Sequence, residues 1–218
     1  MKVKMNISYR TLQGTKADLY SEYMTPEDAL KLAGDLYKTK RVKEIIIVDD
    51  SDREWSIAEL EKLIEQIETE PHSIEIYFDG GYDKYSHQSG LGIVIYYEQD
   101  EKKYRVRRNA KVDALRSNNE AEYAALHLAT KELADLGVGQ TEVKCFGDSL
   151  VVINQMRGDW ASYDQELNDW ADRIDLGFDT LQINPIYKMI NRNDNKEADK
   201  LASQALQDIS ISSVIERA

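Results

Sequence analysis

The chain has 218 residues, 42% of them hydrophobic, which allows one large domain or two modest ones with a real core. Its formal net charge of −12 has the wrong sign for a protein held on nucleic acid by overall attraction, so such a role would need local basic patches. No apolar run approaches membrane-spanning length, and the single cysteine, Cys145, excludes an internal disulfide framework and makes a reducing cytoplasm the simplest location.

The first part of the chain, residues 1–70, predicts a small α/β domain. Its apolar and turn patterns predict strands over 3–9, 17–24 and 42–48 and helices over 25–40 and 56–67. The first helix has a threonine N-cap, Thr25, followed by proline, and the second begins with a capping box formed by Ser56 and Glu59. Nothing in this acidic segment assigns it a function.

A short linker over 68–73 precedes a second domain over 73–207, and residues 208–218 form a C-terminal tail. The patterns predict strands over 74–81, 91–97, 103–110, 141–146 and 181–190 and helices over 119–136, 150–156, 163–174 and 194–206. An antiparallel meander followed by alternating helices and strands is typical of a mixed α/β layer architecture.

Two aspartates share one sequence context, a strand that ends in an acid beside a small residue. Asp79 follows Phe78 and precedes Gly80 and Gly81, and Asp148 lies between Gly147 and Ser149. If the two strands are neighbours, both carboxylates lie at the same edge of the sheet, where open α/β sheets bind ligands. The alternative is that both are ordinary turn residues.

Two further acids stand in predicted helices. Glu122 shares its face with Ala125, Leu126 and Ala129, so its carboxylate would be buried at a cost unless it has a partner. Asp199 lies in the first turns of the last helix. For both residues the alternative is stabilisation by the positive end of the helix dipole.

Four segments carry these acids in order: Phe78-Asp79-Gly80-Gly81, Ser117-Asn118-Asn119-Glu120-Ala121-Glu122, Gly147-Asp148-Ser149 and Asn195-Lys196-Glu197-Ala198-Asp199. Together they resemble type 1 ribonuclease H, and most of all its compact bacterial and archaeal members, which lack a basic protrusion. The resemblance covers residues 73–207. It implies a ribonuclease H-like fold, with a five-stranded mixed sheet of an antiparallel meander and then parallel strands, and helices on both faces.

The resemblance also implies an activity. In this family the four acids, here Asp79, Glu122, Asp148 and Asp199, bind two Mg²⁺ ions, for which Mn²⁺ is a substitute, and act in catalysis. The reaction cuts the RNA strand of an RNA–DNA hybrid and leaves 5′-phosphate and 3′-hydroxyl ends. The alternative is a catalytically silent protein that keeps the fold and binds nucleic acid or protein partners.

Candidate contacts to the hybrid come from the same resemblance. Asn118 and Asn119 would contact the minor groove, Ser117 a DNA phosphate, and the backbone at Gly80 and Gly81 the RNA strand. The loop before Asp199 lacks the histidine that assists product release in many members, and Arg192 is its possible stand-in. Separately, a local basic cluster includes Arg105 and Arg107, which would either contact phosphates or protect an edge strand by their charge.

Overall fold

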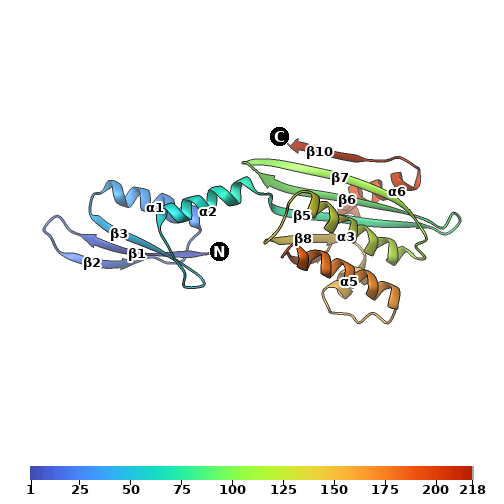
Figure 1. The fold of residues 1–218 in the computed structure, drawn as a ribbon, viewed down its shortest axis with the longest axis horizontal. Coiled ribbons are helices and arrows are strands. Elements are labelled where there is room, and N and C mark those ends of the chain that lie inside the picture. The colour runs from blue at the N-terminus through green and yellow to red at the C-terminus, as the bar shows by residue number, and fades with distance from the viewer. Residues whose placement is uncertain (218) are drawn as a thin grey trace. The chain divides into compact units, whose positions relative to one another are not determined.

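The computed structural model describes residues 1–217, without the side chains of residues 66–68. Ala218, the end of the predicted tail, and the side chain of Ile67, the last residue of the second predicted helix, lie outside the described residues. The chain divides into two compact units, Met1–Thr69 and a second unit that begins at Glu70. Figure 1 shows both units.

The first unit is a four-stranded antiparallel sheet with two helices. Its elements are β1 (Val3–Arg10), β2 (Lys16–Tyr20), α1 (Pro26–Lys38), β3 (Val42–Asp49), β4 (Glu54–Trp55) and α2 (Ile57–Thr69), and the described strands follow the order β2-β1-β3-β4. Every second residue of β1 from Val3 to Ile7 is buried, as its alternation predicts. The Thr25 hydroxyl accepts from the amide of Asp28, and Ser56 and Glu59 form the predicted capping box, so both predicted helix starts are confirmed.

The second unit is built on a mixed sheet. Its strands are β5 (His72–Asp83), β6 (Gln88–Gln99), β7 (Lys102–Asp113), β8 (Glu142–Gly147), β9 (Asn184–Met189) and β10 (Ser212–Arg217), in the order β10-β7-β6-β5-β8-β9 among the described residues. Strands β7, β6 and β5 form the predicted antiparallel meander, and β8 and β9 run parallel to β5.

Helices cover both faces of this sheet. They are α3 (Asn118–Asp135), α4 (Leu150–Met156), α5 (Gln165–Thr180) and α6 (Lys196–Leu206), with a 3₁₀ turn, η1, over Arg192–Asp194. Consecutive strand residues face opposite sides of a sheet. A methyl group at Gly80 would meet the α3 backbone, whereas one at the next residue, Gly81, would meet Leu206 of α6, so α3 and α6 lie on opposite faces. Within the described part of the chain, no helix has the length and apolar character needed to cross a membrane.

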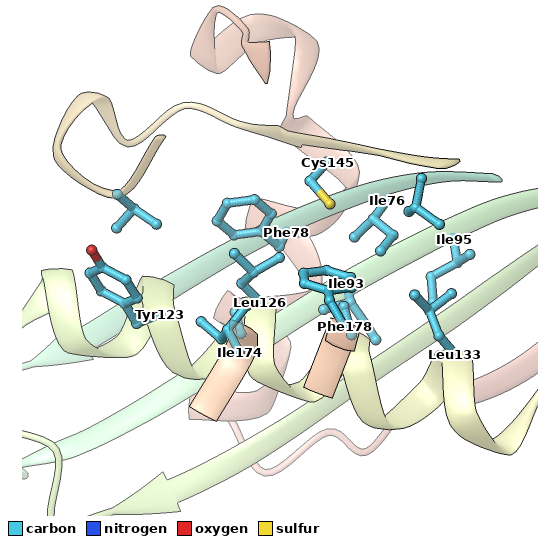
Figure 2. Close-up of a cluster of buried hydrophobic side chains, with 14 of the residues drawn as sticks. Ile76, Phe78, Ile93, Ile95, Tyr123, Leu126, Leu133, Cys145, Ile174 and Phe178 are labelled. Carbon is cyan, nitrogen blue, oxygen red and sulfur yellow. The ribbon is translucent and has the colours of Figure 1, made fainter. Parts of the chain in front are cut away.

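The core of the second unit lies between the sheet and α3. Figure 2 shows Phe78, Ile93 and Leu126 among its buried side chains. Phe178 of α5 belongs to the same cluster. Cys145 is fully buried in the same cluster, which agrees with a small core residue.

The C-terminal segment differs from the prediction. Residues 208–218 were expected to form a tail, but β10 pairs with β7 from Ser212 opposite Arg108 to Arg217 opposite Lys103. The described sheet therefore has six strands rather than five. It follows that β7 is not an edge strand, which removes edge protection as the reason for its basic residues.

Candidate metal centre

Strand β5 carries Asp79 beyond the end of its parallel neighbour. The β5–β8 pairing stops at Tyr77 opposite Phe146, whereas β5 continues to Asp83 because it also pairs with β6. The prediction that the strand ends at Asp79 is therefore wrong. Asp79 lies inside the strand, at the level where β8 ends and the chain turns into Asp148.

Three carboxylates converge at this level of the sheet. Asp79 from β5, Glu122 from α3 and Asp148 from the turn after β8 each place an oxygen within 4.8 Å of the other two. Asp79 is 9% exposed and Glu122 is 5% exposed. Oxygens on opposite sides of one divalent cation lie about 4 to 5 Å apart, so the spacing matches a shared ion.

The electrostatics of the three groups favour a cation. Burial, then the charges of Asp148 and Asp199, raise the pKa of Asp79 to about 7, and Arg192 opposes the rise. Burial, followed by the charges of Asp79 and Asp148, also raises the pKa of Glu122 well above its usual value, although the Gly80 amide donates to it. A divalent cation would remove the penalty of bringing these charges together.

The donor set fits a hard divalent ion. Each of the three converging groups is a carboxylate, the ligand type of Mg²⁺ and Mn²⁺ sites. Among the described residues, the buried Oε2 atom of Glu122 has no hydrogen-bond partner. A buried carboxylate oxygen without a donor is costly, and an ion beside Glu122 would supply the missing interaction.

Asp199 lies beside this group of three rather than within it. The group whose oxygens lie within 4.8 Å of one another is Asp79, Glu122 and Asp148, but the charge of Asp199 contributes to the raised pKa of Asp79. Nη2 of Arg192 donates to Oδ1 of Asp199 at 3.1 Å. This hydrogen bond, then the charges of Asp199, Asp79 and Asp148, raise the pKa of Arg192, so one guanidinium faces three of the four predicted ligands.

Asn195 connects two of the elements that carry the carboxylates. Its Nδ2 atom donates to the carbonyl oxygen of Phe78 at 2.9 Å and to Oδ1 of Asp148 at 2.8 Å. The capping role that its position predicts for the α6 N-terminus is absent, because its side chain makes no capping hydrogen bond.

The predicted groove-binding residues gather at the N-terminus of α3. The hydroxyl of Ser117 accepts from the amide of Glu120 and caps the helix, and Asn118 and Asn119 occupy its first turn. Asn118 is exposed and Asn119 is partly exposed. Both asparagines precede Glu122 by one helical turn, so they lie at the same end of α3 as the carboxylates.

Arg105 and Arg107 already have an acidic partner. Arg105 Nη1 and Arg107 Nε lie 3.1 Å and 3.2 Å from Oε1 of Glu197 in α6. Both side chains are 26% exposed. Contact of the two arginines with phosphate stays a prediction from the sequence, and the ion pairs with Glu197 compete with it.

Glu120 has a role that its position in the motif did not suggest. The position of Glu120, two residues before Glu122 and off its apolar face, favours a solvated side chain, but Glu120 is 8% exposed. It accepts from Nε1 of Trp170 at 3.0 Å and from the Arg116 amide at 2.7 Å. The Ser117-x-x-Glu120 pattern at the helix start was the available signal. Glu120 therefore connects the first turn of α3 to α5 through its hydrogen bond with Trp170.

Comparisons with known proteins show which family the chain belongs to. A family model described as reverse transcriptase-like matches residues 77–205. The Bacillus subtilis protein YpeP is 40% identical over 207 residues, which are 94% of this chain and 91% of YpeP. Ribonuclease HI of Halobacterium salinarum is 37% identical over 95 residues, 42% of this chain and 45% of that protein.

Solved structures resemble the second unit. Ribonuclease H1 of Halobacterium salinarum has a TM-score of 0.54 at 26% identity, over 62% of this chain and 98% of that chain. LC11 ribonuclease H1, isolated from compost and solved in complex with an RNA/DNA hybrid, has a TM-score of 0.55 at 26% identity, over 62% of this chain and 98% of that chain. The chain belongs to the reverse transcriptase-like family and, within it, to type 1 ribonuclease H.

Proposed function

We propose that the chain is an endoribonuclease that hydrolyses the RNA strand of RNA–DNA hybrids and leaves 5′-phosphate and 3′-hydroxyl ends. The observation that carries this proposal is the convergence of Asp79, Glu122 and Asp148 within 4.8 Å in a type 1 ribonuclease H chain. The hybrid as substrate is supported by LC11 ribonuclease H1, which was solved with an RNA/DNA hybrid.

Four carboxylates would hold two Mg²⁺ ions, or Mn²⁺ in their place: Asp79, Glu122, Asp148 and Asp199. When bound, these ions supply activation of water and neutralisation of charge on the leaving oxygen. The protein's own task is to present deprotonated carboxylates, so Asp79 and Glu122 must lose the protons that burial and like charge favour.

Contacts to the hybrid would come from the α3 N-terminus and from β5. Asn118 and Asn119 can donate and accept at base edges and at 2′-hydroxyls, which distinguish RNA from DNA. Ser117 would hold a DNA phosphate, while the backbone at Gly80 and Gly81 approaches the RNA strand. Arg105 and Arg107 would reach phosphate only by leaving Glu197.

Arg192 would assist product release. Its side chain is 82% exposed and donates to Asp199, so it can exchange between that carboxylate and a leaving phosphate without a change in the core. A guanidinium suits this role because it binds either partner through charge-assisted hydrogen bonds.

The two units would have separate tasks. We assign the nuclease to residues 73–207 and treat residues 1–70 as an independent domain. In the nuclease domain, β10 extends the folded part beyond residue 207.

One experiment tests the activity. An end-labelled hybrid is incubated with the full chain and Mg²⁺ or Mn²⁺, beside Asp148→Asn and the control Asp172→Asn, which changes an exposed carboxylate on α5. We expect the wild type and the control to cut the RNA strand and Asp148→Asn to be at least 100-fold slower, with product ends read by phosphatase and ligase sensitivity. No cutting by the wild type with either ion would support the catalytically silent alternative.

Parallel substrates define the specificity. Double-stranded RNA and double-stranded DNA of the same sequence replace the hybrid in the same assay. Cutting of the hybrid alone supports the proposal, whereas equal cutting of double-stranded RNA would broaden the substrate class to any duplex that contains RNA.

A further inference from the structure

We propose that Asn195 is a positioning residue that fixes the carboxylate of Asp148 relative to Asp79. This inference rests on the proposed function, because the carboxylates it positions are those of the metal centre. Asn195 itself offers no carboxylate, and in our proposal it acts only through Asp148 and the β5 backbone.

Both N–H hydrogens of the Asn195 side-chain amide are used in hydrogen bonds. Asn195 is 1% exposed, and its Nδ2 group donates to the Phe78 carbonyl at 2.9 Å and to Oδ1 of Asp148 at 2.8 Å. A primary amide has two hydrogens, so both are used. One holds the strand at the residue before Asp79, and the other holds Asp148 itself.

This arrangement comes at the expense of an ordinary helix cap. An asparagine at the N-cap normally accepts from an amide of the first turn, which stabilises the helix. Asn195 makes no such bond, and its buried Oδ1 atom has no hydrogen-bond partner among the described residues. The side chain is therefore directed toward β5 and Asp148 although local helix stability favours the opposite orientation.

The consequence is a fixed spacing across three elements. Asn195 is the N-cap residue of α6, the helix that carries Asp199, and it connects the start of that helix to β5 and to the turn after β8. With one oxygen of Asp148 held by the amide, the carboxylate has a defined orientation toward Asp79. Residues that orient ligands in this way commonly change metal affinity by 10-fold to 100-fold when removed.

Asn109 provides a matched control. Its Nδ2 atom donates to the carbonyls of Leu201 at 3.0 Å and Ile209 at 2.8 Å, and its Oδ1 atom accepts from the Ile211 amide at 2.7 Å. Like Asn195, it joins α6 to the sheet through its side-chain amide, but these bonds contact no carboxylate. Asn109→Ala therefore reproduces the loss of an α6 anchor without the loss of positioning.

The test compares Asn195→Ala and Asn109→Ala in the full chain. Mn²⁺ affinity is measured by calorimetry at fixed pH, thermal unfolding is measured without metal, and kcat and KM are measured on the hybrid. We expect both variants to unfold at lower temperature, because each leaves buried polar groups unpaired. Only Asn195→Ala should bind Mn²⁺ at least 10-fold more weakly, with a lower kcat and a hybrid KM within twofold of wild type.

Wild-type Mn²⁺ affinity in Asn195→Ala would overturn the inference, as would an equal loss in Asn109→Ala. If Asn195→Ala does not fold, Asn195→Ser takes its place, since serine is too short to reach both acceptors and should show the same loss of affinity. A wild type that binds Mn²⁺ but cuts no hybrid defeats the proposed function. The inference about Asn195 is then decided by the Mn²⁺ affinities of the two variants alone. A wild type that binds no Mn²⁺ defeats both.

Discussion

Gly80 of β5 lies so close to Ala121 of α3 that a methyl group at Gly80 would stand 2.1 Å from the Ala121 carbonyl carbon. The backbone of the strand thus packs directly on the helix turn that carries Glu122. This close approach, rather than a turn, is the structural reason for a glycine after Asp79, and it sets how near Glu122 comes to Asp79.

The first prediction concerns this contact. Gly80→Ala should force β5 and α3 apart, lower the free energy of unfolding by about 1 to 3 kcal/mol and weaken Mn²⁺ binding, because Glu122 moves away from Asp79. Urea unfolding and calorimetry measure the two effects. Gly81→Ala is the control for stability, since its added methyl group would make an ordinary 3.5 Å contact with Leu206. Equal stability of the two variants would contradict the argument.

The second prediction concerns pH. The pKa of Asp79 is raised from 3.8 to about 7 by burial and then by Asp148 and Asp199, so the folded, metal-free protein binds this proton more tightly than the unfolded chain. This contribution to stability is full below about pH 4 and is lost as the pH rises through about 7. The free energy of unfolding without metal should therefore fall toward pH 8, by up to roughly 4 kcal/mol from this residue.

Chemical denaturation across this pH range measures that fall, with Asp79→Asn as the comparison. The amide does not ionise, so the variant should lose the part of the pH dependence that belongs to Asp79 and should be more stable than the wild type at pH 8 without metal. With Mn²⁺ present the wild type should recover stability as the pH rises, because deprotonation favours metal binding. An unchanged pH profile in Asp79→Asn would show that burial of Asp79 is not its source.

The three acids that converge, Asp79, Glu122 and Asp148, can be singled out from the sequence because each stands in a local motif, Asp-Gly-Gly or Asn-Asn-x-Ala-Glu for instance. Strand β10 cannot be predicted in this way, because Ser212–Arg217 is short and mostly exposed and so has no buried face, and its pairing partner β7 is distant in the sequence. The partner of Glu120 was also out of reach, because Trp170 lies 50 residues away. Local patterns predict which side chains a helix or strand exposes on each face. Contacts between segments distant in the sequence decide which polar groups find hydrogen-bond partners.

The third prediction concerns Arg192. Its guanidinium competes with any cation for Asp199, so Arg192→Gln should strengthen Mn²⁺ binding by about 2-fold to 5-fold at low salt. The effect should shrink as salt is added, because Arg192 is largely exposed. Calorimetry at two ionic strengths measures both, and Arg192→Lys, which keeps the charge, is the control. If Arg192 also assists product release, kcat should fall while affinity rises, and weaker Mn²⁺ binding in Arg192→Gln would contradict the competition.

The fourth prediction separates two roles for Arg105 and Arg107. Because both contact Glu197, their main effect should be on folding, and Arg105→Ala or Arg107→Ala should lower the free energy of unfolding by about 1 kcal/mol. A residue that contacts phosphate would instead reduce the slope of log affinity against log salt by about 1. Hybrid affinity of the catalytically impaired Asp148→Asn background, measured over a range of salt, gives that slope. We expect the slope to stay unchanged in both arginine variants and to match that of Lys131→Ala, a control on α3 away from Glu197. A reduced slope would instead show that the two arginines contact phosphates of the hybrid.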